Sequence, residues 1–348
     1  MEDDKFFENK IRTVNGIMCV LVVFLHSYNI ERYSNLSLEI TPLVESFVSF
    51  TVGNVAVPTF FLMSAILFFQ NFNLSKTWTK YRSRISSVLI PYILWNIIYL
   101  IVFLILVNFP LSRQFMDTKE IFMNIQTLID SVLFYQYNGV YWFMYQLILF
   151  ILISPLVYLI MKPRYSILVV PVLLVMSHLI PYIPPYSKGI MVNSLVYWVL
   201  GAYFALHGRE QVFNRCPNSK VYFVLSLFLL MLRFYLMSIN PGLIIYKALD
   251  VLMLLNVVSL WFALDIFKFR LVYDWMGMSF FIYTTHPLIV WSIKNVVSIL
   301  LPGNDAMALM NYIIAGIGGV VIPMCIAKIM SRYVPKLYSI LCGKRVVL

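Results

Sequence analysis

Charged side chains are scarce in this sequence, and their scarcity excludes most classes of protein. Lys, Arg, Asp and Glu make up 12% of the 348 residues, about half the share found in an ordinary soluble domain. A disordered chain would need more charge, a coiled coil would need heptads, and a disulfide-stapled module would need more than 4 cysteines. With 61% hydrophobic residues and a mean hydropathy of +0.85, the chain is expected to be an integral membrane protein.

Histidine and glycine are also few. The 4 histidines are scattered without metal-ligand spacing, so we expect no metal site. Neither a P-loop nor a GxGxxG motif is present. The 13 glycines are few for the paired broken helices of a secondary transporter, and the sequence has no convincing internal repeat.

What the sequence has is long apolar segments. Spans of about 20 apolar residues cross a membrane as helices, and the chain is too short to hold a soluble catalytic domain besides. We therefore predict an all-α, polytopic membrane bundle of about ten transmembrane helices, forming a single domain over residues 1–348. The ten segments lie at roughly 13–29, 52–72, 86–108, 140–160, 166–180, 190–206, 221–239, 248–264, 275–293 and 310–330.

The basic residues predict how the bundle is oriented. Of the 26 Lys and Arg residues, 19 lie in the two tails and in alternate connections, and five lie in the opposite set of connections. The positive-inside rule therefore predicts that both termini are cytoplasmic, which agrees with an even number of spans. The longest external connection is 109–139, where the short apolar stretch Ile121–Phe134 predicts an interfacial or re-entrant helix.

The first segment has a polar stripe on one face. Asn15 and His26 are eleven residues apart, which is nearly three helical turns and about 16 Å along the axis. Arg12 lies on the same face, nearer the cytoplasm. Ionisable groups at membrane depth usually face a cavity or a partner. The alternative is that His26 only forms a hydrogen bond with a neighbouring helix.

A second stripe lies on the ninth segment, where Ser279, Tyr283 and His286 stand at helical spacing. Both segments are predicted to run from inside to outside, so His26 and His286 should lie at comparable depth. Pro287 predicts a local break or kink beside His286. The alternative is that this second stripe is only a packing contact beside a proline kink.

Further polar residues are predicted within the membrane. Arg233 and Asp250 flank an external turn at similar depth, and we expect a buried ion pair whose role is structural or acceptor binding. Trp142 and Tyr145, with Gln146 and Asn256, are candidates to line a carbohydrate cavity, because sugars stack on aromatic faces and form hydrogen bonds with amides. The alternative is that the aromatic residues are ordinary residues of the membrane interface.

Four motifs follow one another across most of the chain. They are Gly-Ile-Met-Cys-Val-Leu-Val-Val-Phe-Leu-His26-Ser27, Val57-Pro58-Thr-Phe-Phe-Leu-Met-Ser64-Ala-Ile-Leu, Tyr141-Trp142-Phe143-Met-Tyr145 and Phe281-Ile-Tyr283-Thr-Thr-His286-Pro287. Each motif alone is mostly apolar and weak, so the specificity comes from their order and spacing. Together they resemble the successive signatures of the membrane-bound acyltransferase-3 family.

The resemblance implies a ten-helix protein of the bacterial cytoplasmic membrane. It further implies an O-acetyltransferase that takes its acyl group from acetyl coenzyme A and acts on a surface polysaccharide, lipopolysaccharide or lipid-linked precursor. His26 corresponds to the family's essential first-span histidine. The chain departs from the pattern at Asn15, where the family usually has Arg or Lys, and at Ala65, where it commonly has Gly. Arg12 is placed to substitute for the missing basic residue.

These observations lead to one mechanistic hypothesis. Acetyl coenzyme A, or another acyl coenzyme A, is a co-substrate rather than a resident cofactor. Its phosphates are expected to bind at the basic inner rim near Arg82 and Arg84, with Lys76 and Lys80. The alternative is that these basic residues only follow the positive-inside rule. The arm of coenzyme A follows the face of Arg12 and Asn15 toward His26. There His26 acts as a general base on an acceptor hydroxyl or is itself acylated. Trp142, Tyr145, Arg233, Tyr283 and His286 are the candidate acceptor-binding residues.

Two other functions are compatible with a polytopic chain. A transporter or flippase of a saccharide would use Arg233, Asp250 and the two histidines as a proton or substrate pathway. A membrane scaffold or subunit would use the histidines only for packing. Transfer of label from acetyl coenzyme A to a glycan or lipid distinguishes the enzyme from both.

Overall fold

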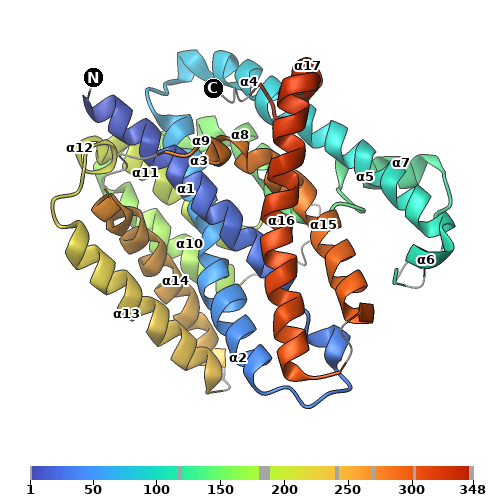
Figure 1. The fold of residues 1–348 in the computed structure, drawn as a ribbon. Coiled ribbons are helices and arrows are strands. Elements are labelled where there is room, and N and C mark those ends of the chain that lie inside the picture. The colour runs from blue at the N-terminus through green and yellow to red at the C-terminus, as the bar shows by residue number, and fades with distance from the viewer. Residues whose placement is uncertain are drawn as a thin grey trace.

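The fold is entirely helical. The computed structural model describes residues 2–113, 115–116, 120–179, 189–239, 243–267, 272–300 and 303–344. Every regular element in these ranges is a helix (Figure 1), which confirms the predicted all-α class. The α-helices are α1 Glu2–Ser27, α2 Ile40–Glu45, α3 Ala56–Phe69, α4 Thr77–Arg84, α5 Ile90–Asn108, α6 Pro110–Arg113, α7 Ile125–Leu133, α8 Trp142–Leu152, α9 Ser154–Met161, α10 Val169–Leu179, α11 Val192–His207, α12 Arg209–Phe213, α13 Ser219–Ser238, α14 Leu243–Ala263, α15 Ser279–Leu300, α16 Asp305–Tyr333 and α17 Pro335–Leu341.

Each of the ten predicted segments contains helix, and several of these helices can cross a membrane. Six helical stretches in the described ranges are long and apolar enough, namely Lys5–Tyr33, Ile40–Phe69, Leu74–Asn108, Ser219–Ser238, Lys247–Phe267 and Asp305–Tyr333. A seventh is formed if Gly139–Leu152 and Ser154–Met161, which meet at a bend of 63°, count as one span. The chain is thus a multi-pass membrane protein, whereas a total of ten spans stays a prediction.

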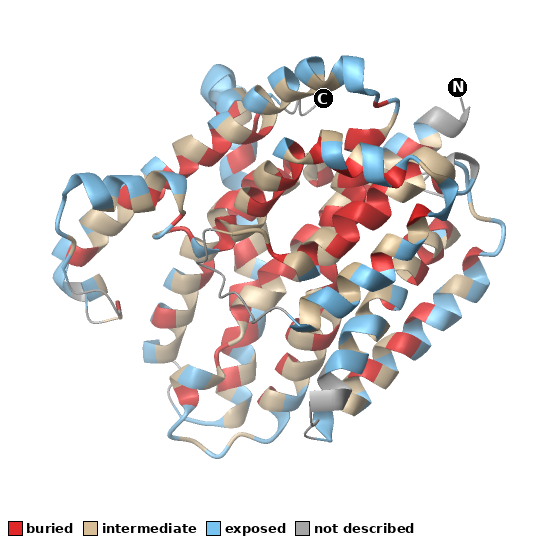
Figure 2. Ribbon diagram, turned by 180° about the vertical axis from the view of Figure 1, so that it is seen from behind, coloured by how far each residue is buried: buried red, intermediate tan, exposed pale blue. Residues whose placement is uncertain are grey.

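Helix α1 lies at the centre of the bundle. It packs on α15 and α16 along one side and on α3 along another. Helix α3 in turn packs closely on α11, while α13 and α14 form a hairpin at the periphery (Figure 1). Figure 2 shows the buried residues concentrated in the middle of the bundle. The residues of α1 therefore meet several distant parts of the chain.

The outer faces of the bundle are apolar as well. On α13 large apolar side chains are exposed on every turn, with Val221, Val224, Phe228, Met231 and Tyr235 among them. An apolar face of this kind is rare on a soluble monomer. It suits contact with lipid, where the backbone polar groups are already satisfied inside the helix.

Both ends of the described chain lie at the same end of the bundle (Figure 1). An even number of crossings requires this arrangement, and we call this the inner end because the charge pattern predicts that it is cytoplasmic. That both termini are cytoplasmic stays a prediction. Among the basic residues that entered the charge count, Lys119, Lys188, Lys268, Arg270 and Arg345 lie outside the described residues.

The apolar stretch Ile121–Phe134 contains the short helix α7, which folds back along α5. The Tyr92 hydroxyl donates to the Leu133 carbonyl at 2.7 Å, and the Asn96 amide donates to the Val132 carbonyl at 3.1 Å. A helix is thus present where one was expected, and its interfacial or re-entrant depth stays a prediction.

Of the break or kink predicted at Pro287, the break is wrong because α15 continues through the proline, whereas a kink stays a prediction. Proline has no N–H to donate to the carbonyl four residues earlier, which is that of Tyr283. The His286 ring supplies the missing donor instead, with Nδ1 2.8 Å from the Tyr283 carbonyl oxygen. A local side-chain bond therefore satisfies the carbonyl that the proline leaves free.

The predicted ion pair between Arg233 and Asp250 is also wrong. Helices α13 and α14 pair as the hairpin predicts, but Arg233 donates to the carbonyl oxygen of Thr51 at 3.3 Å and to Oδ1 of Asn256 at 3.4 Å. Asp250 instead faces Nδ1 of His178 at 3.6 Å. Similar depth on a hairpin does not fix the rotation of the two helices.

Candidate active site

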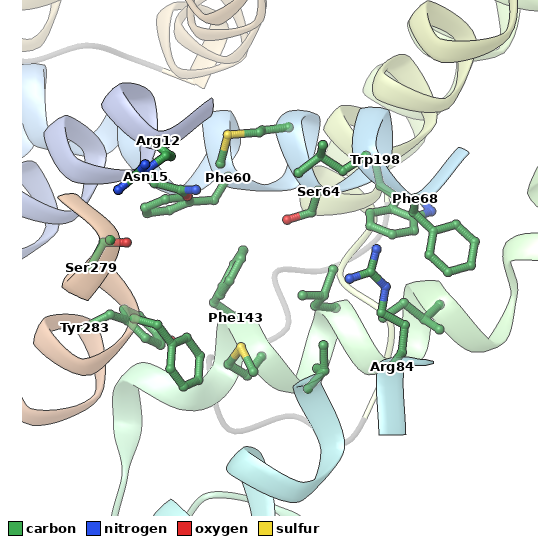
Figure 3. Close-up of a pocket in the computed structure, with 18 of the residues that line it drawn as sticks. Arg12, Asn15, Phe60, Ser64, Phe68, Arg84, Phe143, Trp198, Ser279 and Tyr283 are labelled. Atoms are coloured by element: carbon green, nitrogen blue, oxygen red, sulfur yellow. The ribbon is translucent and has the colours of Figure 1, made fainter. Parts of the chain in front are cut away.

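A cavity of about 390 Å³ opens near the inner end of the bundle. It lies among α1, α3, α8, α11 and α15, and Arg84 at the end of α4 reaches into it (Figure 3). Its volume is in the range of small-ligand sites. Its polar lining consists of Glu8, Arg12, Asn15, Ser64, Arg84, Ser279 and Tyr283, and aromatic rings contribute Phe60, Phe68, Phe143, Trp198 and Phe280.

The α1 wall of the cavity carries the predicted polar stripe. Arg12 and Asn15 line the cavity, and Glu8 continues the stripe one turn toward the inner end, where its side chain is exposed. The wall stays close to the turn before α15 because residue 16 is glycine. A Cβ at Gly16 would come within 2.8 Å of the Met276 side chain. Gly16 thus lets α1 pack closely against the side chains of the turn that precedes α15.

The other walls add a second guanidinium and two hydroxyl groups. The Ser64 and Ser279 hydroxyls and the Arg84 guanidinium all point into the cavity (Figure 3). Arg84 also lies over the Phe68 ring at 5.7 Å from its centroid, an arrangement that holds the side chain by cation–π attraction. Two guanidinium groups beside hydroxyls and aromatic rings suit an elongated ligand with negative charge and amide groups.

The two predicted histidines meet farther along α1 and α15. The ring centroids of His26 and His286 are 5.4 Å apart. His26 is partly exposed, whereas His286 is completely buried. The expectation that the two rings lie at the same depth is therefore confirmed by their contact.

Tyr283 stands between the cavity and the histidine pair. It lines the cavity, its ring centroid lies 6.1 Å from that of His286, and its hydroxyl donates to the Val140 carbonyl at 2.5 Å. Neither histidine is among the residues that line the cavity. A ligand that fills the cavity thus ends at Tyr283, one ring short of the histidines.

Lys294 holds the outer end of α1, on which His26 lies. Its Nζ donates to the carbonyl oxygens of His26 and Tyr28, at 3.1 and 2.8 Å. His26 lies in the last turn of α1 and Tyr28 directly follows its end, where a cation interacts favourably with the helix dipole. Helix α15 therefore contributes both His286 and the group that caps the helix of His26.

The remaining predicted site residues lie apart from these two places. Arg82 is exposed on α4 and does not line the cavity. Trp142 packs on Phe61 with 6.1 Å between ring centroids and does not line the cavity, whereas its neighbour Phe143 does. Tyr145 packs on Tyr135, and Arg233 is buried against Thr51 and Asn256.

Sequence reasoning missed two groups near the inner end. Glu8 stands four residues before Arg12, so extending the stripe by one turn would have identified it. Lys10 forms a fully buried ion pair with Asp265, with 2.7 Å between Nζ and Oδ1, and Nζ also lies 4.2 Å from the Trp261 ring centroid. No local pattern links residues 255 positions apart, so only the tertiary structure reveals this pair.

Comparison with known proteins agrees with the resemblance seen in the motifs. A family described as an acyltransferase domain matches residues 10–328, which is nearly the whole chain. Relatives in Staphylococcus aureus strains MSSA476 and MRSA252, each named a probable poly-beta-1,6-N-acetyl-D-glucosamine export protein, are 22% identical over 311 residues, covering 80% of this chain and 81% of each relative. No solved structure matches the chain. With its helical membrane fold and its match over residues 10–328, the chain belongs to this acyltransferase family and is a membrane acyltransferase.

Proposed function

We propose that this membrane acyltransferase transfers a short acyl group from cytoplasmic acyl coenzyme A to a hydroxyl group of a surface saccharide or its lipid-linked precursor, in the bacterial cytoplasmic membrane. The observation that carries the proposal is the cavity at the inner end, which lies on the same two helices as the histidine pair. Acyl coenzyme A binds in the cavity, and acyl transfer occurs at the histidine pair.

The lining of the cavity fits the arm of coenzyme A. Arg12 and Arg84 supply positive charge for its phosphate groups, because guanidinium groups bind phosphate through paired hydrogen bonds. Ser64 and Ser279 supply hydroxyls for its amide groups, and the aromatic rings cover its alkyl parts. Passage of the thioester from the cavity to His26 requires the Tyr283 ring to move.

His26 is the general base of the proposed reaction. It takes the proton of the acceptor hydroxyl as that oxygen attacks the thioester carbonyl carbon. The carbon–sulfur bond breaks, and the departing thiolate takes the proton back from His26, which yields an acyl ester and free coenzyme A. Direct acylation of His26, followed by attack of the acceptor on the acyl-imidazole, gives the same products.

Transfer of label from acetyl coenzyme A tests the proposal. Membranes that contain the wild-type chain are incubated with radiolabelled acetyl coenzyme A, and label is counted in extracted glycans and lipids. We expect His26→Ala to lower the rate by about 10²- to 10⁴-fold, the contribution of a positioned general base. Insertion into the membrane and thermal stability serve as controls for folding. Full activity of a folded His26→Ala protein would remove the proposal.

The acceptor is identified by a second measurement. Mass spectrometry of surface and lipid-linked glycans from cells with and without the chain should show the loss of one acyl mass per modified sugar. That mass also identifies the acyl group, whether acetyl, succinyl or another short chain. Unchanged glycan masses would contradict a saccharide acceptor.

Export of a saccharide is the second candidate function. It is favoured by the name of the Staphylococcus aureus relatives, which refers to export of poly-beta-1,6-N-acetyl-D-glucosamine. An exporter moves its substrate across the membrane without covalent change. Unmodified saccharide that crosses into vesicles only when this chain is present, with no acyl transfer, would favour this candidate over the enzyme.

A further inference from the structure

The His286 ring has one nitrogen whose role is fixed by its surroundings. Nδ1 lies 2.8 Å from the carbonyl oxygen of Tyr283 and 3.2 Å from that of Ile282. A carbonyl oxygen only accepts hydrogen bonds, so Nδ1 carries the proton. Pro287 makes this bond favourable, because it leaves the Tyr283 carbonyl without its usual helical N–H partner.

The other nitrogen of His286 is consequently an acceptor. Within the described residues, Nε2 is buried and has no hydrogen-bond partner. A buried acceptor without a partner is costly, at about 1–3 kcal/mol. An isolated packing histidine offers no compensation for that cost, which suggests that Nε2 has a partner during the reaction.

The His26 ring is a candidate donor. With 5.4 Å between the two ring centroids, a nitrogen of His26 comes within hydrogen-bonding distance of Nε2 after a small rotation of the His26 ring, while Nδ1 of His286 keeps its carbonyl partners. His286 itself is completely buried, so it is placed to act through His26 and not on a substrate directly. Lys294, two turns farther along α15, fixes the backbone of His26.

We propose that His286 is a positioning residue whose Nε2 accepts a hydrogen bond from the His26 ring. This inference rests on the proposed function of His26 as a base. The bond fixes which nitrogen of His26 carries the proton, so the other nitrogen presents its lone pair to the acceptor hydroxyl. When His26 takes up that proton, both of its nitrogens carry protons, and the bond to Nε2 stabilises the positive ring until the thiolate is protonated.

Two substitutions at His286 separate this role from packing. His286→Asn keeps a donor near the place of Nδ1 but has no atom at the place of Nε2. His286→Gln has an amide oxygen near the place of Nε2 but no donor at the place of Nδ1. We expect the asparagine variant to lower the maximal rate of label transfer by about 10- to 100-fold, with the KM for acetyl coenzyme A unchanged, and the glutamine variant to recover most of the loss.

If the role of His286 is purely structural, the order of the two variants in activity is reversed. If His286 only satisfies the Tyr283 carbonyl, His286→Asn should be active and stable while His286→Gln is impaired, which would overturn the inference. Equal activity of both variants, or an equal loss in both with the fold intact, would also overturn it. In a His26→Ala chain, His286→Asn should cause no additional loss, because its effect passes through His26.

The two proposals fail in distinguishable ways. Absence of acyl transfer by the wild-type chain, or full activity of His26→Ala, removes the proposed function and the role of His286 with it. A strong loss in His26→Ala beside wild-type rates in His286→Asn removes only the positioning role.

Discussion

The two ends of α1 use polar residues in opposite ways. At the inner end, Lys10 is neutralised by the buried Asp265 carboxylate, while Arg12, half a turn away, faces an open cavity. At the outer end, His26 faces a second imidazole, and Lys294 donates to the backbone carbonyl oxygens of His26 and Tyr28. The inner end thus combines a closed ion pair with an open cavity, whereas the outer end packs closely around one ring.

The buried pair at the inner end should give the largest effect on stability. Lys10→Met leaves the Asp265 carboxylate without its cation, and we expect the free energy of unfolding to fall by about 3–5 kcal/mol. Thermal denaturation of the purified protein in detergent measures this loss. Lys5→Met, at an exposed position of the same helix, is the matched control, and the double variant Lys10→Met with Asp265→Leu should recover much of the stability.

Equal stability of the Lys10→Met and Lys5→Met variants would show that the inner end of α1 does not depend on this ion pair. The contrast between a closed pair and an open cavity would then lose its energetic basis.

Arg84, which faces the cavity at the same end of the bundle, should affect binding of the acyl donor. Arg84→Gln removes a guanidinium that faces the cavity, and we expect the KM for acetyl coenzyme A to rise by about 10- to 100-fold, as for loss of a charged hydrogen bond. The maximal rate should change little, because the chemistry occurs elsewhere. Arg82→Gln lies on the same helix but outside the cavity, so its KM should stay near the wild-type value.

Equal KM values for the Arg82 and Arg84 variants would contradict donor binding in this cavity. They would instead indicate that the basic residues of α4 act through the general surface charge.

Lys294, which caps α1 at the outer end, should give the smallest effect on the rate of acyl transfer. Lys294→Met removes the cation from the last turn of α1, and we expect the maximal rate to fall by about 3- to 30-fold, in line with the energy of a charge at a helix terminus. The KM for acetyl coenzyme A should not change. Ser292→Ala, exposed on the same helix, is the control, and a raised KM in the Lys294 variant would mean that the outer end also binds the donor.

Several features of the site could be predicted from the sequence because they are local. The spacing of Arg12, Asn15 and His26 defines one helical face wherever the helix packs, and Ser279, Tyr283 and His286 define another. The comparable depth of His26 and His286 followed from topology, because both helices were predicted to run in the same direction, whereas the contact between the two rings is known only from the structure. The family resemblance was likewise visible in ordered motifs, and the match over residues 10–328 confirms it.

Other features depend on contacts that no local pattern specifies. Trp142 and Phe143 are neighbours in sequence, yet only Phe143 faces the cavity, because the rotation of α8 decides between them. Arg82 and Arg84 are separated in the same way at the end of α4. The break expected at Pro287 was wrong because the His286 ring takes the place of the missing backbone donor, a side-chain geometry that the proline rule does not include.

The amino-acid sequence by itself determined that this chain forms membrane helices, which residues share a helical face, and to which family it belongs. These properties follow from hydropathy, from the helical period and from the order of short motifs. Only the tertiary structure decided that Lys10 pairs with Asp265, that Arg84 faces the cavity and that Tyr283 separates the cavity from the histidines. Those outcomes depend on how helices rotate and pack against one another, and in lipid that packing is governed by shape and polar contacts between residues far apart in the chain.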